Sequence, residues 1–208
     1  MPIAFDAFGT LFDLNWLRRI AGDELYDAFY ARLQPWTWLA TAAGAYRPLP
    51  ELAEQAFRSA AEETGADADP AELAGKLTEL PLFPEVEQAL EALRGERLAV
   101  LSNGTPDGLE RLLSNAGIRD RFEHVLAADA VGRYKPAPEV YALAPRAFSV
   151  EADEVTLVSA NAWDVAGAKL SGLRAVWVSR GRPRSSVLGV DADEVVEDLA
   201  SLTFVYRR

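Results

Sequence analysis

The sequence predicts an α/β fold built on a parallel β-sheet, and three observations support this fold class. Short apolar runs bounded by turn residues alternate with longer segments of helical periodicity. The runs are apolar almost throughout, which is typical of parallel strands covered by helices on both faces. About ninety residues separate the first run from the second, whereas a crossover between parallel strands needs only a dozen or more. We therefore expect a Rossmann-like parallel sheet core with helices on both faces and an inserted helical cap subdomain.

The elements of the core follow from the apolar runs and from the periodic segments between them. The expected strands are residues 3–5, 98–102, 124–127, 156–159 and 175–178. The expected helices are residues 85–93, 108–115, 138–148 and 162–171. Residues 188–206 are interpreted as an acidic loop, a short helix and a terminal strand at residues 203–206.

The long insertion after the first strand is expected to be helical. Its helices are predicted at residues 17–38, 50–64 and 70–79. Pro35 is expected to end or kink the first of them, because proline donates no amide hydrogen bond and its ring clashes with the preceding turn. The expected division is a core domain of residues 1–14 and 80–208 and a cap subdomain of residues 15–79.

Composition and charge exclude several classes of protein. The chain has 208 residues, no cysteine and one histidine, His124, which excludes disulfides and makes a His/Cys zinc site improbable. A formal net charge of −11 is the opposite of what nucleic-acid backbones require. No apolar run approaches the roughly 20 residues of a membrane span, and an acid stands at position 6, where a signal peptide would carry basic residues. We expect a cytoplasmic protein that binds neither nucleic acid nor membranes.

The negative charge is concentrated in two segments. Residues 51–80 carry a net charge of −6 and residues 191–200 a net charge of −5. Because these segments account for the whole of the −11, the rest of the chain is balanced. The acidity therefore gives no argument against a small anionic substrate.

Polar side chains follow four of the expected strands at the point where each strand ends. Ligands of open α/β sheets bind at the carboxyl ends of the strands, so these side chains are candidates for one site. Together they supply two carboxylates, an ammonium group, and hydroxyl and amide groups. The four segments are residues 6–10, 102–104, 134–135 and 159–164.

These segments resemble the motifs of the haloacid dehalogenase superfamily and, within it, the type II L-2-haloacid dehalogenases. The resemblance is carried by Phe5-Asp6-Ala7-Phe8-Gly9-Thr10-Leu11-Phe12-Asp13, Leu101-Ser102-Asn103-Gly104, Tyr134-Lys135-Pro136 with Tyr141, and Ser159-Ala160-Asn161-Ala162-Trp163-Asp164. It implies a hydrolase that works through a covalent aspartyl ester, without a metal or other cofactor. The implied substrates are short 2-haloalkanoic acids.

The resemblance makes Asp6 the nucleophile. A carboxylate can attack an electrophilic carbon or phosphorus, form an ester and be released by hydrolysis, whereas a turn aspartate is the structural alternative. The superfamily's phosphatases carry a second acid where this chain has Phe8, and another where it has Ala160. Without these acids the chain lacks a general acid and a metal ligand, which favours displacement of a halide, a leaving group that needs no proton.

The remaining catalytic roles also come from the resemblance. The residues implied to orient Asp6 or the hydrolytic water are Thr10, Ser159, Asn161 and Asp164. Lys135 is implied to balance the charges of Asp6 and Asp164, with Tyr141 supporting it. A surface lysine before a proline turn is the structural alternative for Lys135.

The substrate-binding roles fall to residues around the same strand ends. Ser102 and the backbone N–H groups of Ala7 and Phe8 are implied to hold the substrate carboxylate through charge-assisted hydrogen bonds, with Asn103 beside them. Trp163 is implied to line an apolar wall beside the carbon under attack. The alternative for Trp163 is an ordinary core residue at the start of a helix.

The cap departs from the family pattern where the departing halide is received. The dehalogenases carry an arginine eight residues before the tryptophan of a Tyr-Thr-Trp-Leu stretch. In this sequence the matching stretch is Trp36-Thr37-Trp38-Leu39, and the residue eight positions before Trp38 is Tyr30. Arg32 would project about 200° away around the helix, while Arg18 and Arg19 are other donors. The halide is expected to leave toward the ring edges of cap aromatics, unless these rings only pack the cap against the core. The aromatics are Tyr30, Trp36, Trp38 and Tyr46.

Three functional hypotheses remain open at this point. The first is metal-independent dehalogenation of short 2-haloalkanoic acids through Asp6. The second is a divergent relative without the halide-binding arginine, acting on another substrate or with little dehalogenase activity. A magnesium-dependent phosphatase is a weaker third. The expected partner is a small haloacid, and a homodimer could form.

Overall fold

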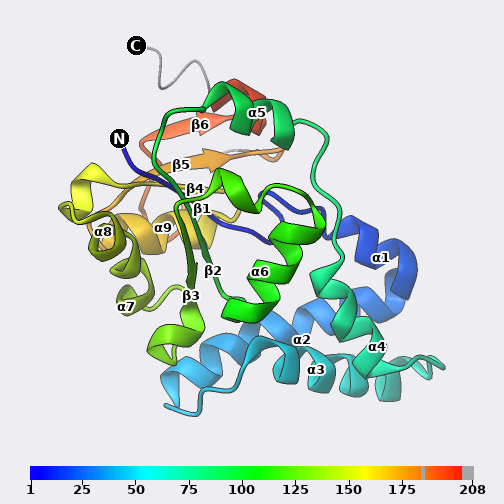
Figure 1. The fold of residues 1–208 in the computed structure, drawn as a ribbon. Helices are drawn as coiled ribbons and strands as arrows, with labels where there is room; N and C mark the ends of the chain where they lie inside the picture. The colour runs from blue at the N-terminus through cyan, green and yellow to red at the C-terminus, as the bar shows by residue number, and fades with distance from the viewer. Residues whose placement is uncertain (184–185, 203–208) are drawn as a thin grey trace.

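The computed structural model describes residues 1–183 and 186–202, and its centre is a six-stranded parallel sheet in the order β3-β2-β1-β4-β5-β6 (Figure 1). The strands are β1 (Ile3–Phe5), β2 (Leu98–Ser102), β3 (His124–Ala127), β4 (Thr156–Ser159), β5 (Arg174–Val178) and β6 (Glu194–Val196). The predicted fold class is confirmed. Because β1 lies between β2 and β4, the residue that follows it stands in the middle of the carboxyl edge of the sheet.

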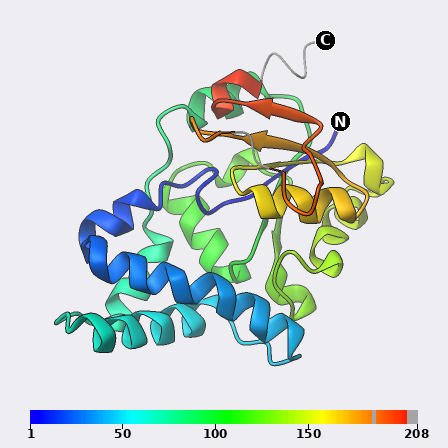
Figure 2. The same cartoon turned by 180° about the vertical axis from the view of Figure 1, so that it is seen from behind.

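Helices cover both faces of the sheet, as the apolar strands require. Helices α5 (Val86–Ala92) and α6 (Pro106–Asn115) pack on one face, and α7 (Pro138–Tyr141), α8 (Leu143–Phe148) and α9 (Ala162–Leu170) pack on the other (Figures 1 and 2). The alternation of side chains in β1 matches this arrangement. Ile3 and Phe5 join the core beneath α5 and α6, whereas Ala4 joins the core beneath α7, α8 and α9.

Two parts of the core differ from the prediction. Residues 194–196, expected to lie outside any strand, form β6 and pair in parallel with β5. This short segment acquires strand structure by hydrogen bonding to the edge of β5. The helix expected at residues 138–148 is divided into α7 and α8, since the ring of Pro145 clashes with the carbonyl of Tyr141 in a continuous helix. The predicted terminal strand at residues 203–206 lies outside the described residues.

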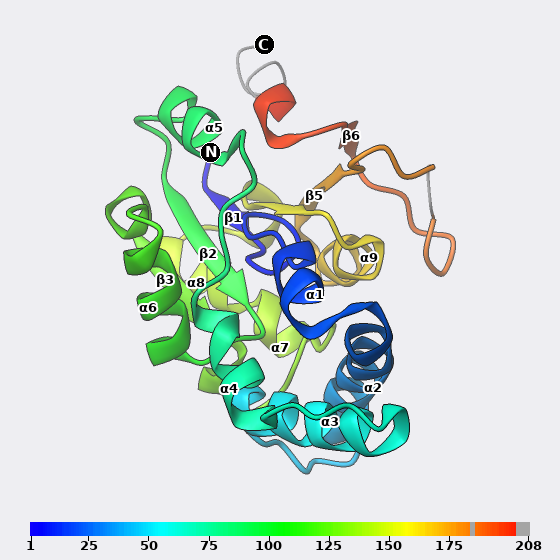
Figure 3. The same ribbon diagram turned by 90° about the vertical axis from the view of Figure 1, so that its right-hand side faces the viewer.

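The inserted segment is helical, and Figures 1 and 3 show it lying across the carboxyl edge of the sheet. It consists of α1 (Asn15–Ala21), α2 (Asp23–Ala42), α3 (Leu49–Thr64), α4 (Pro70–Gly75) and a 3-10 turn, Lys76–Thr78. Helices α2 and α3 pack along each other, and the stacked rings of Phe29 and Phe57 lie between them with centroids 3.6 Å apart.

The first predicted cap helix was wrong in its bounds at both ends. Gly22 adopts φ +84° and ψ 153°, a conformation that side chains strongly disfavour, and it separates α1 from α2. Pro35 does not end the helix, which continues to Ala42. Leu33 and Trp36 on either side of the proline pack against the hydrophobic core, and this burial offsets the roughly 3 kcal/mol cost of a proline inside a helix.

The chain leaves the core and returns to it along one path. The Asp13 N–H donates to the Pro81 carbonyl at 2.9 Å, and the Phe83 N–H donates to the Leu11 carbonyl at 3.0 Å. These backbone hydrogen bonds hold the outgoing and returning segments together. Their position supports the division proposed at residues 14 and 80, which stays a proposal.

Candidate active site

The polar side chains at the carboxyl edge of the sheet converge on Asp6. Asp6 follows β1 directly, Asn161 lies in the turn between β4 and α9, and Lys135 lies in the segment between β3 and α7. Neighbouring parallel strands end at the same edge of a sheet, so residues far apart in the sequence meet there. The convergence expected from the sequence is therefore present.

Lys135 bridges two carboxylates in the interior of the protein. Its Nζ donates to Asp6 Oδ1 at 3.2 Å and to Asp164 Oδ2 at 2.9 Å. The exposed fraction is 1% for Lys135, 5% for Asp6 and 0% for Asp164. Tyr141 donates its hydroxyl to Asp164 Oδ1 at 2.7 Å and so fixes the second carboxylate. Buried charges persist when they are paired and hydrogen-bonded in this way.

Both oxygens of Asp6 accept hydrogen bonds. Besides the bond from Lys135 to Oδ1, Oδ2 accepts from Thr10 Oγ at 2.9 Å and from Asn161 Nδ2 at 3.0 Å. Burial raises the pKa of Asp6, and the positive charge of Lys135 opposes this rise. These hydrogen bonds are all donated to the carboxylate, so they favour the ionised form that a nucleophile needs.

The basic and phenolic groups of the cluster stay protonated. Burial acts to lower the pKa of Lys135, but the charges of Asp164 and Asp6 outweigh it, and the pKa is raised above its ordinary value. Burial also raises the pKa of Tyr141 well above the usual value for a phenol. Lys135 and Tyr141 therefore remain hydrogen-bond donors around neutral pH.

Further hydrogen bonds hold the residues that contact Asp6. Thr10 Oγ accepts from the Ala160 N–H at 2.9 Å, and Ser159 Oγ accepts from the Asn161 N–H at 3.1 Å. Arg180 donates to the Thr10 carbonyl at 2.7 Å. The end of β4 and the turn after β1 are thereby joined, and the side chains of Thr10 and Asn161 are set against the carboxylate.

The end of β2 contributes a second connection. Asn103 Oδ1 accepts from the Lys135 N–H at 2.8 Å, which fixes the segment that carries the lysine. Ser102 is fully buried, and its hydroxyl oxygen accepts from the Gly104 N–H at 3.4 Å. The Ser102 hydroxyl hydrogen is left to donate elsewhere.

A small chamber opens in front of Asp6, between the core and the cap. Its volume is about 70 Å³. Polar groups from Asp6, Asn103 and Asn161 lie on the core side. The other residues that line it are Phe8, Leu14, Phe29, Tyr30, Leu33, Gln34, Thr37, Leu49, Leu77 and Trp163.

Not every residue predicted to bind substrate reaches this chamber. Phe8, Tyr30 and Trp163 line it, and Asn103 does so from the end of β2. Trp38 does not, and neither do Ala7, Ser102 and Tyr141, which are buried. Trp38 is 39% exposed and packs edge-on against Trp163, with ring centroids 6.0 Å apart. The direct role predicted for Trp38 is corrected to a contact with a lining residue.

The arginines considered in the cap are occupied elsewhere. Arg32 donates to the Ala28 carbonyl and to Ser59, and it forms an ion pair with Glu63. The ion-pair partners of Arg18 are Asp23 and Asp27, and that of Arg19 is Asp13. None of these arginines is a lining residue of the chamber.

Arg182, which the sequence analysis did not single out, lies near the site. Its guanidinium donates to the Ala160 carbonyl, one residue before Asn161, and its Nε donates to the Ser179 carbonyl at 3.0 Å. Burial and the charge of Asp6 raise the pKa of Tyr30, and the charge of Arg182 acts in the opposite direction. In the sequence, Arg182 is only an arginine in the turn after a core strand, and this feature is too common to identify a site residue.

Two features are absent from residues 1–183 and 186–202. No helix there is both long and apolar enough to cross a membrane. In the same residues, no group of three or more His, Cys, Asp or Glu side chains is placed to hold a metal ion.

Comparison with known proteins finds one matching family model and relatives with two kinds of hydrolase activity. Residues 3–172 match the family model described as haloacid dehalogenase-like hydrolase. The chain is 33% identical to the (S)-2-haloacid dehalogenase of Pseudomonas sp. (strain YL), over 98% of this chain and 93% of the relative. It is 41% identical to the phosphoserine phosphatase of Thermus thermophilus over a shorter region, 69% of this chain and 58% of the relative.

A solved structure extends the similarity over the full length of the fold. The L-2-haloacid dehalogenase of Xanthobacter autotrophicus with chloropropionic acid covalently bound superposes with a TM-score of 0.92. The two chains are 29% identical, and the match covers 99% of this chain and 98% of that one.

Proposed function

The chain belongs to the haloacid dehalogenase-like hydrolase family, and we propose that it hydrolyses the carbon–halogen bond of short 2-haloalkanoic acids. One observation carries this proposal. Asp6 is held as a buried carboxylate by Lys135, Thr10 and Asn161, and the neighbouring position 8 holds an aromatic ring in place of a second acid. Such a site can displace a leaving group that needs neither a proton nor a metal ion.

The reaction proceeds in two steps through an ester on Asp6. An Asp6 oxygen attacks C2 of the substrate, the C–O bond forms with inversion, and the halide leaves with the bonding electron pair. Water then attacks the side-chain carboxyl carbon of Asp6, the bond from that carbon to the ester oxygen breaks, and this oxygen leaves on the 2-hydroxy acid after taking up the proton that the water loses. We assign to Asp164, the second carboxylate of the cluster, the role of accepting the proton that this water loses.

The protein distributes the remaining charges around the nucleophile. Lys135 offsets the charges of both carboxylates, and Tyr141 holds Asp164 in place. We assign binding of the substrate carboxylate to three hydrogen-bond donors, because an anion is held by donors rather than by further acids. These donors are the Ser102 hydroxyl and the N–H groups of Ala7 and Phe8. Ser159 and Asn161 keep Asp6 and the water aligned.

The halide departs on the cap side of the chamber. Tyr30 lines that side, and its raised pKa keeps the phenol protonated as a donor. Trp163 contributes an apolar wall. The charge of Arg182, whose guanidinium donates to the Ala160 carbonyl, acts to lower the pKa of Tyr30. We assign to this end of the chamber the stabilisation of the leaving anion.

The size of the chamber supports a short substrate. A cavity holds one water molecule in about 10–15 Å³, so a volume of about 70 Å³ accommodates about five to seven non-hydrogen atoms. Chloroacetate and 2-chloropropanoate are of this size. Phosphate-ester hydrolysis is less well supported despite the similarity to a phosphatase, because Phe8 and Ala160 replace the acids that chemistry would use. Cytoplasmic location and a homodimer remain predictions.

The experiment is a halide-release assay on the purified chain. With 2-chloropropanoate and bromoacetate, the wild-type chain should release halide without added metal, and Asp6→Asn should release at least a thousandfold less. Intact-mass spectrometry of rapidly quenched reactions should show an adduct of the mass of a carboxyalkyl ester on the wild-type chain and none on Asp6→Asn.

Two results would contradict the proposal. One is a correctly folded wild-type chain that releases no halide from either substrate. The other is hydrolysis of a phosphate monoester that requires added magnesium and is lost in Asp6→Asn, which would establish the phosphatase in its place.

A further inference from the structure

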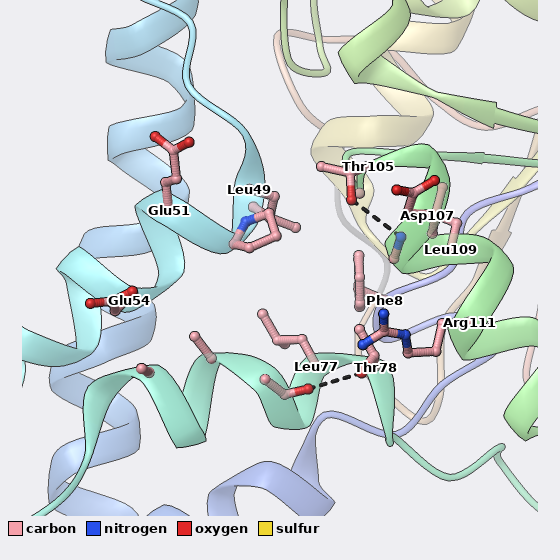
Figure 4. Close-up of a pocket in the computed structure, with 16 residues that line it drawn as sticks. Phe8, Leu49, Glu51, Glu54, Leu77, Thr78, Thr105, Asp107, Leu109 and Arg111 are labelled. Atoms are coloured by element: carbon pink, nitrogen blue, oxygen red, sulfur yellow. Dashed lines mark hydrogen bonds between the residues drawn. The ribbon is translucent and has the colours of Figure 1, made fainter.

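A second, larger cavity lies next to the chamber, and Figure 4 shows the residues around it. Its volume is about 420 Å³. Helix α3 borders it at Leu49, the turn after α4 borders it at Leu77, and the start of α6 borders it at Leu109. The roles described above do not use this cavity.

Three residues border both cavities. Phe8, Leu49 and Leu77 line the chamber in front of Asp6 and also line the larger cavity. The partition is therefore one residue thick and apolar. Leu49 and Leu77 come from the cap and Phe8 from the core, so the partition is formed where the two meet.

The charges at the rim of the larger cavity restrict what it can hold. Glu51 and Asp107 are exposed there, and Glu54 is already paired with Arg58 at 2.7 Å. Arg111 is the positive residue of the rim. With more carboxylates than guanidinium groups at the rim, a second anionic group is disfavoured, whereas a hydrocarbon chain between the leucines is favoured.

We propose that the larger cavity is an alkyl-chain subsite, which takes the tail of 2-haloalkanoic acids longer than four carbons, such as 2-bromohexanoate and 2-bromooctanoate. This inference rests on the proposed function. The carboxylate, C2 and the halogen occupy the chamber at Asp6, and the chain from C3 or C4 onward passes Phe8, Leu49 and Leu77. Short acids use the chamber alone, and longer uncharged tails gain binding energy from the second cavity.

The first test is a series of 2-bromoalkanoates of increasing length. Burial of each added methylene should raise kcat/KM about fourfold from 2-bromobutanoate to 2-bromohexanoate, with no decline at 2-bromooctanoate. A tail ending in a carboxylate should lose this gain because of the acidic rim. A steep fall in kcat/KM beyond 2-bromobutanoate would overturn the proposal.

The second test fills the cavity from the cap. Gly75 and Ala71 line it; a Cβ added to Gly75 meets no atom within 4 Å, and Ala71 is exposed. In Gly75→Phe and in Ala71→Phe, the ratio of kcat/KM for 2-bromooctanoate to that for bromoacetate should fall at least tenfold. Ala92→Phe, at an exposed position of α5 outside both cavities, is the matched control and should leave the ratio unchanged. An unchanged ratio in both cavity variants would overturn the subsite.

A binding measurement separates failure of the subsite from failure of the proposed function. If bromoacetate is not turned over, the proposed function fails, and calorimetry with octanoate still examines the cavity. Octanoate should bind the wild-type chain and Ala92→Phe equally, and Gly75→Phe at least tenfold more weakly. Equal binding to all three chains would overturn the subsite whatever the catalytic result.

Discussion

The carboxylates of Asp6 and Asp164 share one ammonium group where water is almost excluded. Each of these charges would be costly alone, because desolvation of an ion in the protein interior amounts to several kcal/mol. Lys135 contacts both carboxylates, and Thr10, Asn161 and Tyr141 satisfy remaining oxygen lone pairs. The arrangement keeps Asp6 ionised while leaving it poorly solvated, which is the condition for a reactive carboxylate nucleophile.

The pH dependence of activity should report the hydrogen bond from Thr10. Burial raises the pKa of Asp6, and the Thr10 hydroxyl and Lys135 lower it. Activity is lost as the pH falls through the pKa of Asp6, because only the carboxylate attacks. Thr10→Val removes a group that lowers this pKa, so the acid limb of kcat/KM against pH should move to higher pH.

The matched variant for this prediction is Thr10→Ser. It retains a hydroxyl that can donate to Asp6 and accept from the Ala160 N–H. Its acid limb should stay close to that of the wild-type chain. If Thr10→Val and the wild-type chain share the same acid limb, Thr10 does not tune the nucleophile.

Helices α7 and α9 approach each other closely at Gly167. A Cβ added there would lie 2.8 Å from Pro136 Cβ and 2.9 Å from Tyr141 Cε2. Tyr141 is fully buried and holds Asp164, so it cannot move aside without disturbing the ion cluster. A residue without a side chain in α9 therefore sets the distance between two elements of the site.

Gly167→Ala should damage both stability and catalysis. Overpacking costs about 1–3 kcal/mol, and the better helix propensity of alanine returns at most about 1 kcal/mol. We expect the melting temperature to fall by a few degrees, up to about 8 °C, and kcat to fall at least tenfold because Tyr141 and Asp164 are displaced. Calorimetry and steady-state kinetics measure the two effects.

Gly75→Ala is the control for that substitution. Gly75 lies in α4, and a Cβ added there meets open space. This variant should be as stable as the wild-type chain or slightly more stable. Equal melting temperatures and equal kcat for Gly167→Ala and the wild-type chain would show that α7 and α9 separate at little cost.

Cap and core are joined on the side of Lys135 by several hydrogen bonds. Tyr134 donates its hydroxyl to the Arg47 carbonyl at 2.6 Å, and its N–H donates to Thr41 Oγ at 2.9 Å. Tyr46 donates to Asp129 Oδ1 at 2.8 Å. Because Tyr134 precedes Lys135, docking of the cap is mechanically connected to the ion cluster.

Tyr46→Phe should weaken this docking. One hydrogen bond to a charged group is lost, which contributes about 1.5–3 kcal/mol in favourable cases. We expect KM for 2-chloropropanoate to rise about threefold to tenfold, with a smaller change in kcat, as measured by steady-state kinetics.

Tyr26→Phe is the control within the cap. The Tyr26 ring contacts Arg18, Phe29 and Tyr30 inside the cap, and a phenylalanine ring at this position keeps these contacts. Its KM should match that of the wild-type chain. A Tyr46→Phe chain with unchanged KM would show that this hydrogen bond does not contribute to closure.

Local patterns predicted most of the core, and contacts between elements decided the exceptions. The apolar runs of β1, β2 and β4 indicate strands that are buried on both faces, so these strands were predicted at their observed positions. Strand β6 and the extension of α2 beyond residue 38 to Ala42 were missed. Both depend on neighbours, the edge of β5 and the apolar core, that no local pattern contains.

The sequence sufficed to predict the parallel sheet, the helical insertion and the residues that surround Asp6, because strand ends of a parallel sheet converge whatever the loops between them do. Only the tertiary structure decided that Trp38 packs edge-on against Trp163 and that Arg182 donates to the carbonyl of Ala160, next to Asn161. The tertiary structure also decided that Phe8, Leu49 and Leu77 form the partition between the two cavities. These contacts join segments far apart in the chain, and their geometry follows from how the cap docks on the core, which depends on packing across the interface.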